Sequence, residues 1–147
     1  MDGDSISPNR HPDIDNIIEL LDVLAHMRDV TGNPVGFTTV LGASGWLDEI
    51  FTEVIRRGEQ SAPDFITIDG GDGGTGAAPM SLIDDVGLTL KESLVMLVDA
   101  LDRYGLRSRT RVGASGKLIT PANVAWTLCM GADFVASAPV NINLIEY

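Results

Sequence analysis

The chain has 147 residues, of which 44% are hydrophobic and 16 are glycine, so it is long enough for one domain with an apolar core. Its formal net charge of −11 disfavours contact with nucleic-acid backbones, so we expect no nucleic-acid partner. A single cysteine excludes an internal disulfide, and we find no leader and no long apolar run, so we expect a cytoplasmic protein with no membrane partner.

The first part of the chain predicts an extended lead-in followed by a helix, a strand and a second helix. The lead-in, residues 1–12, is polar and contains two prolines, and we interpret its His11 as a loop histidine. A cap on Asp13 or Asp15 is expected to start the first helix. The expected elements are a helix to about Val30, a strand over 34–41 and a helix over about 46–57. The side chains expected to face the core are Ile17, Ile18, Leu20, Leu21, Leu24, Ala25, Met27, Leu47, Ile50, Phe51 and Val54.

A glycine-rich stretch follows the next predicted strand, which covers residues 64–69. It reads Asp69-Gly70-Gly71-Asp72-Gly73-Gly74-Thr75-Gly76 and continues to Pro79. Glycine lets a ligand approach the main chain, and ligands of α/β sheets bind beyond the carboxyl ends of the strands. The alternative interpretation is a plain surface loop. The stretch is not a P-loop, because no Gly-Lys-Ser or Gly-Lys-Thr follows.

The last part of the chain predicts two further helices and two further strands. Thr89 is expected to cap a helix that ends at Gly105, and Pro121 fits the first turn of the other helix. Within that last helix we interpret Cys129 as a small core residue rather than a nucleophile. In order, these elements are a helix over about 89–105, a strand over 111–114, the loop Ser115-Gly116-Lys117, a helix over about 121–131 and a strand over 133–138.

The alternation of strands and helices predicts a parallel α/β sheet with right-handed crossovers. Four strands are compatible with an open sheet or with half of a closed (β/α)8 TIM barrel. The small polar residues that follow each strand favour the barrel, whose active sites lie at the carboxyl ends of the strands.

Three segments together resemble a known family. They are Ile6–Ile14, Asp72–Pro79 and the run from Ala114 to Pro121, and they resemble the FMN-binding synthase domain of glutamate synthase. The resemblance extends from about Ile6 to Ala138, and its Asp-Gly-Gly-Thr-Gly-Ala run is highly specific. It implies that residues 13–138 are the C-terminal half of a TIM barrel, with four parallel strands and outer helices, followed by a divergent tail over 139–147.

The same resemblance implies an activity and a set of binding residues. The family reduces 2-iminoglutarate, made from 2-oxoglutarate and ammonia, to glutamate with reduced FMN, and usually receives electrons through an iron–sulfur cluster. It implies flavin and substrate contacts at one loop and phosphate contacts at two others. These cofactor-binding residues are Gly73, Gly74, Thr75, Gly76, Ser115, Gly116, Lys117 and Ser137.

The sequence also departs from the family pattern. Thr38 stands where the family has a lysine directed into the barrel mouth, and the tail after Ala138 carries no cysteine for a cluster. We therefore expect the chain alone to be inactive and to associate with a companion half barrel or with itself as a homodimer. The alternatives are a non-catalytic remnant that binds FMN, phosphate or a partner chain, and a small flavodoxin-like binding module.

Overall fold

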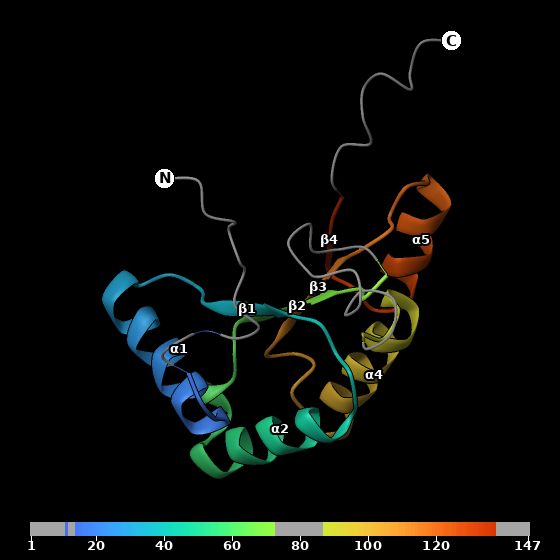
Figure 1. Cartoon of the computed structure of the whole chain (residues 1–147). Coiled ribbons are helices and arrows are strands. Elements are labelled where there is room, and N and C mark those ends of the chain that lie inside the picture. Colours follow the sequence, from blue (N-terminus) through green and yellow to red (C-terminus); the bar gives the residue numbers. More distant parts are fainter. Residues whose placement is uncertain (1–10, 12–13, 73–86, 138–147) are drawn as a thin grey trace, which may run out of the picture.

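The computed structural model describes residue 11 and residues 14–72 and 87–137. Within these residues, the four strands form one parallel sheet in the order β1-β2-β3-β4, and the helices lie along one face of it (Figure 1). The elements are α1 Ile17–Thr31, β1 Gly36–Thr39, α2 Gly45–Arg57, the 3-10 helix η1 Glu59–Ser61, β2 Phe65–Asp69, α4 Leu90–Arg103, β3 Arg111–Ser115, α5 Pro121–Cys129 and β4 Phe134–Ala136. The predicted half barrel with outer helices is confirmed.

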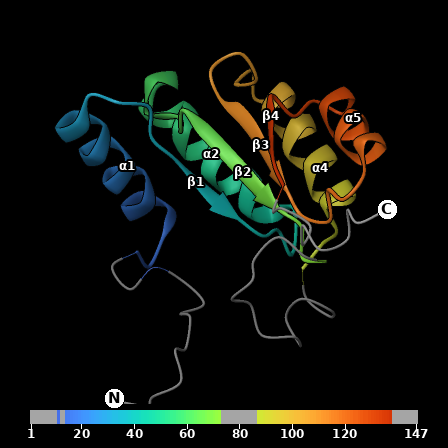
Figure 2. The same cartoon turned by 90° about the horizontal axis from the view of Figure 1, so that it is seen from above.

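The strands alternate between an outer face, covered by helices, and an inner face. On the outer face, Phe37 packs edge-on against Trp46 of α2, with ring centroids 5.7 Å apart. The neighbouring side chains of the strand must then point the other way, because side chains alternate along a strand. The register places one inner row straight across the sheet, consisting of Thr38, Thr67, Gly113 and Phe134. The strands run side by side in one direction (Figure 2).

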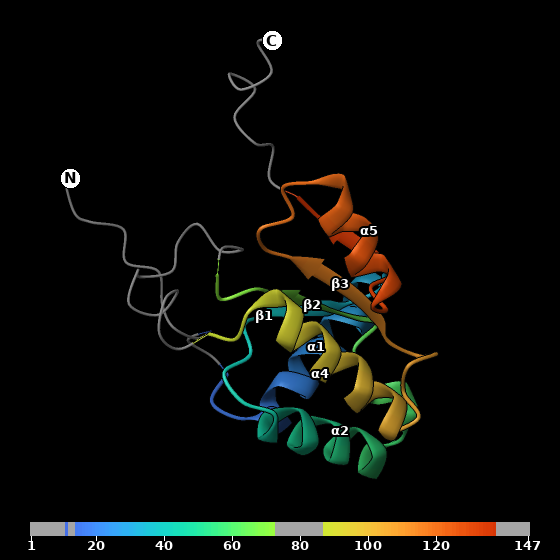
Figure 3. The same cartoon turned by 90° about the vertical axis from the view of Figure 1, so that its right-hand side faces the viewer.

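The core lies between the outer face of the sheet and the helices. Helix α4 lies between α2 and α5 (Figure 3), and its Leu94, Leu97 and Leu101 are fully buried. The inward residues predicted for α2 are all buried as well: Leu47, Ile50, Phe51 and Val54. Of the face predicted for α1, only Leu21 and Leu24 are buried, while Ile18 and Met27 are exposed. The apolar side chains of α2 and α4 are therefore more completely buried than those of α1.

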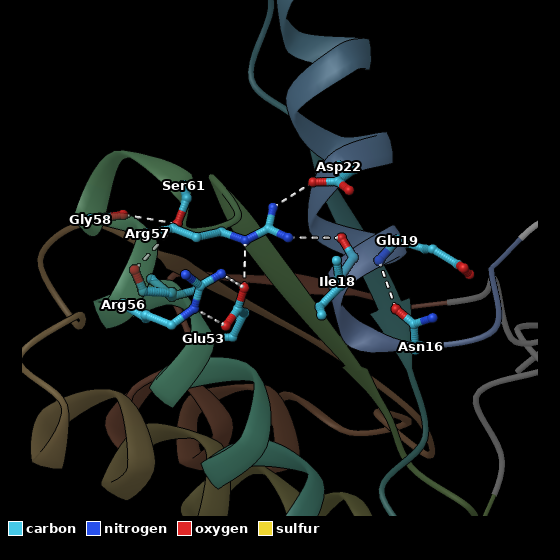
Figure 4. Close-up of polar contacts among 10 residues, drawn as sticks. Asn16, Ile18, Glu19, Asp22, Glu53, Arg56, Arg57, Gly58 and Ser61 are labelled. Carbon is cyan, nitrogen blue, oxygen red and sulfur yellow. Dashed lines mark hydrogen bonds and ion pairs between the residues drawn. The ribbon is translucent and has the colours of Figure 1, made fainter.

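Helix α1 is fastened to α2 by the side chain of Arg57. Its Nη1 lies 2.6 Å from Asp22 Oδ1, and its Nη2 donates to the carbonyl oxygen of Ile18 (Figure 4). Glu53 accepts hydrogen bonds from both Arg56 and Arg57. These two side-chain hydrogen bonds lower the pKa of Glu53 to about 2. The polar contacts of Arg57 therefore join α1 to α2, in addition to the packing of the two helices in the core.

Two aspartates, Asp64 and Asp133, make matching contacts at the amino ends of the strands. Asp64, just before β2, accepts a 2.8 Å hydrogen bond from the N–H of Val35 and forms ion pairs with Arg28 and Arg109. Asp133, just before β4, accepts a 2.7 Å hydrogen bond from the N–H of Val112. It also forms ion pairs with Arg107 and Arg111. Each aspartate thus joins one strand to the strand before it.

Two details of the predicted elements are wrong. Helix α1 is capped by Asn16, whose side chain accepts a 3.0 Å hydrogen bond from the N–H of Glu19, and not by Asp13 or Asp15. Any of these residue types can cap a helix, and here the chain leaves the extended conformation at Asn16. The prediction that Cys129 is a small core residue is also wrong. Cys129 is exposed, and the buried residue of α5 is Thr127.

The predictions for the two ends of the chain fall mostly on residues that the structure does not describe. His11 is exposed, and the rest of the lead-in 1–12 and the tail 139–147 lie outside the described residues. Within the part of the chain that the structure describes, no helix is both long and apolar enough to cross a lipid bilayer.

Candidate functional site

The loops that follow β2, β3 and β4 meet at one edge of the sheet. They must do so because the strands are parallel, so that their carboxyl ends share an edge. The N–H of Gly70, directly after β2, donates a 2.8 Å hydrogen bond to the carbonyl oxygen of Ser115 at the end of β3. The hydroxyl of Ser137, directly after β4, donates a 2.9 Å hydrogen bond to the carbonyl oxygen of Leu118. Three consecutive loops are therefore connected by hydrogen bonds.

Gly116 occupies a position that requires glycine. Its φ is 120°, in the region that side-chain-bearing residues rarely adopt, and it is buried against Gly70. A Cβ at this position would lie 2.9 Å from the backbone nitrogen of Gly70 and 3.1 Å from its Cα. The loop after β3 thus passes against the loop after β2 with no space for a side chain.

Lys117 and Asp72 join the same two loops through their side chains. The Lys117 Nζ lies 3.8 Å from Asp72 Oδ2, and the Lys117 side chain is 61% exposed. Asp72 Oδ1 also accepts a 3.4 Å hydrogen bond from the N–H of Leu90 at the start of α4. Lys117 itself has a φ of 44°, and its carbonyl oxygen accepts a hydrogen bond from the Asn123 side chain. The lysine is thereby presented at the edge of the sheet, with its carbonyl oxygen held by hydrogen bonds from the Asn123 side chain and the N–H of Ile119.

A cleft of about 520 Å³ opens beside these loops, between the first turns of α4 and α5. Both helices begin there with a threonine cap: Thr89 accepts from the N–H of Glu92, and Thr120 accepts from the N–H of Asn123. The Lys91 amine lies over the ring of Trp126, 5.5 Å from its centroid. The cleft is lined by residues of both helices and by the loop after β3, namely Asp72, Thr89, Leu90, Lys91, Gly116, Lys117, Leu118, Ala122, Asn123, Trp126 and Thr127.

The structure brings together those predicted site residues that it describes. Ser115, Gly116 and Lys117 form the loop after β3, and Ser137 contacts that loop from the end of β4. Thr38 lies two strands away from this loop, exposed on the inner face of the sheet. The predicted flavin and substrate contacts Gly73, Gly74, Thr75 and Gly76 lie outside the described residues.

Sequence reasoning missed two residues of this edge. Asn123 and Trp126 line the cleft or support Lys117, but nothing in their spacing distinguishes them from ordinary helix residues. Asp72 belongs to the glycine-rich stretch that the sequence singled out, but its contact with Lys117 was not predicted. Only the capping position before Asn123 gave a signal, because Thr120 precedes the proline at the start of α5.

The chemistry of this edge suits an anionic group, because its lining carries two lysines and one aspartate. Lys117 and Lys91 supply positive charge, and the loop around Gly116 supplies closely approachable backbone. In the described ranges 14–72 and 87–137, no three His, Cys, Asp or Glu side chains are placed to hold a metal ion together.

Comparison with known proteins finds a matching protein family and similar proteins. Residues 2–144 match a protein family described as a conserved region in glutamate synthase. The chain is 46% identical to the Bacillus subtilis "Glutamate synthase large subunit-like protein YerD" over 134 residues, which cover 90% of this chain and 25% of that protein. It is 30% identical to the "Archaeal-type glutamate synthase (NADPH)" of Dehalococcoides mccartyi over 135 residues, 92% of this chain and 26% of that protein. The chain spans about a quarter of the length of these relatives.

Proposed function

Because this chain belongs to the glutamate synthase family, we propose that it supplies the C-terminal half of a (β/α)8 barrel that makes glutamate. The proposed reaction is reduction of 2-iminoglutarate, formed from 2-oxoglutarate and ammonia. FMN is the proposed cofactor, and when bound it would supply the hydride. The observation that carries the proposal is the junction of three loops at the carboxyl ends of the strands, where barrel enzymes bind their ligands.

The described residues fit the phosphate end of FMN. Gly116 lines the cleft and is held against the loop after β2, and the amine of Lys117 is exposed beside it. We assign to Lys117 the attraction of the phosphate and to Ser115 and Gly116 its close backbone contacts. Ser137 would hold the phosphate loop in place, because its hydroxyl is hydrogen-bonded to the carbonyl oxygen of Leu118. Gly73, Gly74, Thr75 and Gly76 remain the proposed contacts of the flavin ring and the substrate.

We propose further that the chain alone does not turn over. Hydride transfer needs the reacting atoms held about 3–3.5 Å apart in a fixed orientation, and one half of a barrel mouth surrounds a ligand on one side only. The inner face also presents the neutral hydroxyl of Thr38 where a lysine is expected. A cation there would stabilise the charge that develops on the flavin and substrate. A companion half barrel or a second copy would have to complete the mouth.

The test is an anaerobic assay of the purified chain. Chemically reduced FMN, 2-oxoglutarate and ammonium are added, and glutamate is measured beside a protein-free control, while quenching of flavin fluorescence reports FMN binding. We expect weak FMN binding without glutamate above the control. Glutamate formation by the chain alone would show that the half barrel is already an enzyme. The absence of any FMN binding would remove the assignment of Ser115, Gly116 and Lys117.

The alternative function is a non-catalytic module that binds FMN, phosphate or a partner chain. Thr38 favours it, because it replaces the cation expected in the mouth. A flavodoxin-like module is less well supported, since a doubly wound sheet carries helices on both faces and here they lie on one face (Figure 1). The alternative and the main proposal are distinguished by glutamate formation after the other half barrel is added.

A further inference from the structure

Asp69, the last residue of β2, is the one ionisable side chain that is buried among the residues that the structure describes. It is 6% exposed, whereas the other ionisable residues of the described ranges are half-buried or exposed. Burial takes a carboxylate out of water at a cost in free energy, which hydrogen bonds, ion pairs or a bound ligand can offset. Residues that break the rule of keeping charge at the surface are concentrated at functional sites. Asp69 has no role in the function proposed above, so its burial needs its own explanation.

The side chain of Asp69 faces the inner side of the sheet. Ile66 and Ile68 of the same strand are fully buried in the core on the outer side. Side chains alternate along a strand, so Thr67 and Asp69 point the other way. The Thr67 hydroxyl oxygen lies 2.6 Å from the place that a Cβ of Gly113 would take, which confirms that these two residues share the inner face. Asp69 is therefore a buried carboxylate on the face that lines a barrel mouth.

The register places Asp69 in the last inner row before the loops. Asp69 pairs with Ser115 of β3, and Ser115 pairs with Ala136 of β4. The next residue, Gly70, donates the 2.8 Å hydrogen bond to the Ser115 carbonyl oxygen that joins the loops after β2 and β3. Asp69 is the one ionisable member of this row of three, and it lies where barrel enzymes bind their ligands.

Positive and negative charge lie on different sides of this edge. Lys91 and Lys117 line the cleft together with residues of α4 and α5, which cover the outer face of the sheet (Figure 1). Asp69 lies on the inner face instead. The lysines attract an anion, and Asp69 attracts a cation. In the proposed reaction, 2-oxoglutarate is an anion, whereas the nitrogen is positively charged in ammonium and in protonated 2-iminoglutarate.

We propose that the carboxylate of Asp69 binds the substrate nitrogen, first in ammonium and then in the protonated imine. An ionised carboxylate only accepts hydrogen bonds, and both of these groups donate charged N–H. Its charge also favours the cationic imine over the neutral carbonyl group from which the imine forms. Asp69 is then a catalytic residue that selects the imine for reduction, while it takes up no electrons and forms no covalent bond. The identity of this ligand rests on the proposed function.

The first experiment measures the urea denaturation midpoint of the full chain. Asp69→Asn keeps the shape of the side chain and removes its charge. It should leave the midpoint unchanged or raise it, because a charge that serves a ligand is not one that stabilises the fold. Asp64→Asn, at the other end of β2, is the matched control. The Asp64 carboxylate is paired with Arg28 and Arg109, so its loss should lower the midpoint. An equal fall in both variants would show that Asp69 is structural and would overturn the proposal.

The second experiment measures binding of the nitrogen ligand without turnover. A ligand that binds the folded chain raises the denaturation midpoint. Ammonium chloride should therefore give the unsubstituted chain a higher midpoint than sodium chloride at the same concentration, and Asp69→Asn should abolish this difference. No difference between the two salts in the unsubstituted chain, or the same difference in the variant, would overturn the proposal.

The third experiment measures glutamate formation by the full chain assembled with the Bacillus subtilis relative from which the matched segment has been deleted. Asp69→Asn should raise the KM for ammonium at least about tenfold and leave the KM for 2-oxoglutarate nearly unaltered. Asp99→Asn, which changes an exposed carboxylate on α4, should alter neither. An unaltered KM for ammonium in Asp69→Asn would overturn the inference. Absence of glutamate from the unsubstituted assembly would contradict the proposed function instead, and the effect of ammonium on stability then decides the inference by itself.

Discussion

Gly116 lies against Gly70 so closely that a Cβ on Gly116 would fall 2.9 Å from the Gly70 backbone nitrogen. The contact holds the loops after β2 and β3 together at the proposed phosphate site. Because the neighbour is backbone and φ is 120°, the chain cannot accommodate even a methyl group there without moving.

Gly116→Ala is therefore expected to destabilise the chain by about 1–3 kcal/mol and to weaken FMN binding. Chemical denaturation and flavin fluorescence measure the two effects. Gly45→Ala is the matched control: Gly45 begins α2 and a Cβ there meets nothing within 4 Å. Alanine favours a helix more than glycine does, so the control should be neutral or slightly stabilising. Equal losses in the two variants would contradict the close-contact account.

Lys117→Met should weaken the binding of FMN about tenfold, because it removes the cation assigned to the phosphate. Riboflavin is the control ligand, since it has the same ring system without a phosphate, and its affinity should not change. Titration of flavin fluorescence measures both. An equal loss of affinity for riboflavin would show that Lys117 does not act on the phosphate.

Asp64 should make stability depend on pH in the acid range. Burial on its own raises the pKa of Asp64, but the hydrogen bonds from the N–H of Val35 and from Arg28 and Arg109 outweigh it and hold the pKa below 3.8. The folded state thus binds the proton less well than the unfolded state. The stabilisation is complete above the unfolded pKa and is lost as the pH falls through the lowered one.

Asp64→Asn is accordingly expected to lower stability near neutral pH by about 2 kcal/mol and to flatten its decline below about pH 4. Asp29→Asn, which changes an exposed carboxylate on α1, is the control and should do neither. Urea denaturation at several pH values provides the comparison. An unchanged acid profile in Asp64→Asn would show that other carboxylates dominate it.

Much of the fold was predictable, because it depends on local and repetitive signals. The strands over 64–69 and 111–114 were found within a residue, since each is a short apolar run between turn residues. The capping box at Thr89 and Glu92 forms as the threonine suggested. The exposure of Cys129 was not predictable, because it depends on which side of α5 the neighbouring elements cover.

The candidate site was only partly predictable for a similar reason. Glycines at strand ends identified the loop around Gly116, because backbone demands are local. The contact between Asp72 and Lys117 joins residues that are far apart in the chain, and only the parallel sheet brings them together. The aspartates before β2 and β4 were missed as well, since their partners come from other elements.

Thr38→Lys should raise glutamate formation roughly tenfold or more in the assembled barrel, because it restores a cation at the mouth. Thr38 is exposed on the inner face, so the change should leave the melting temperature of the isolated chain nearly unaltered. Thr52→Lys, on the outer helix α2, serves as the control and should leave turnover unaltered. Equal turnover by assembled barrels with and without Thr38→Lys would contradict the role assigned to a cation at this position.

The most direct measurement is anaerobic glutamate formation by this chain with and without the Bacillus subtilis relative from which the matched segment has been deleted, supplied with reduced FMN, 2-oxoglutarate and ammonium. The account predicts no glutamate from either protein alone and FMN-dependent glutamate from the 1:1 complex. Glutamate from this chain alone, or none from a complex that sedimentation shows to be fully formed, would contradict the proposal that it supplies half of a glutamate-producing barrel.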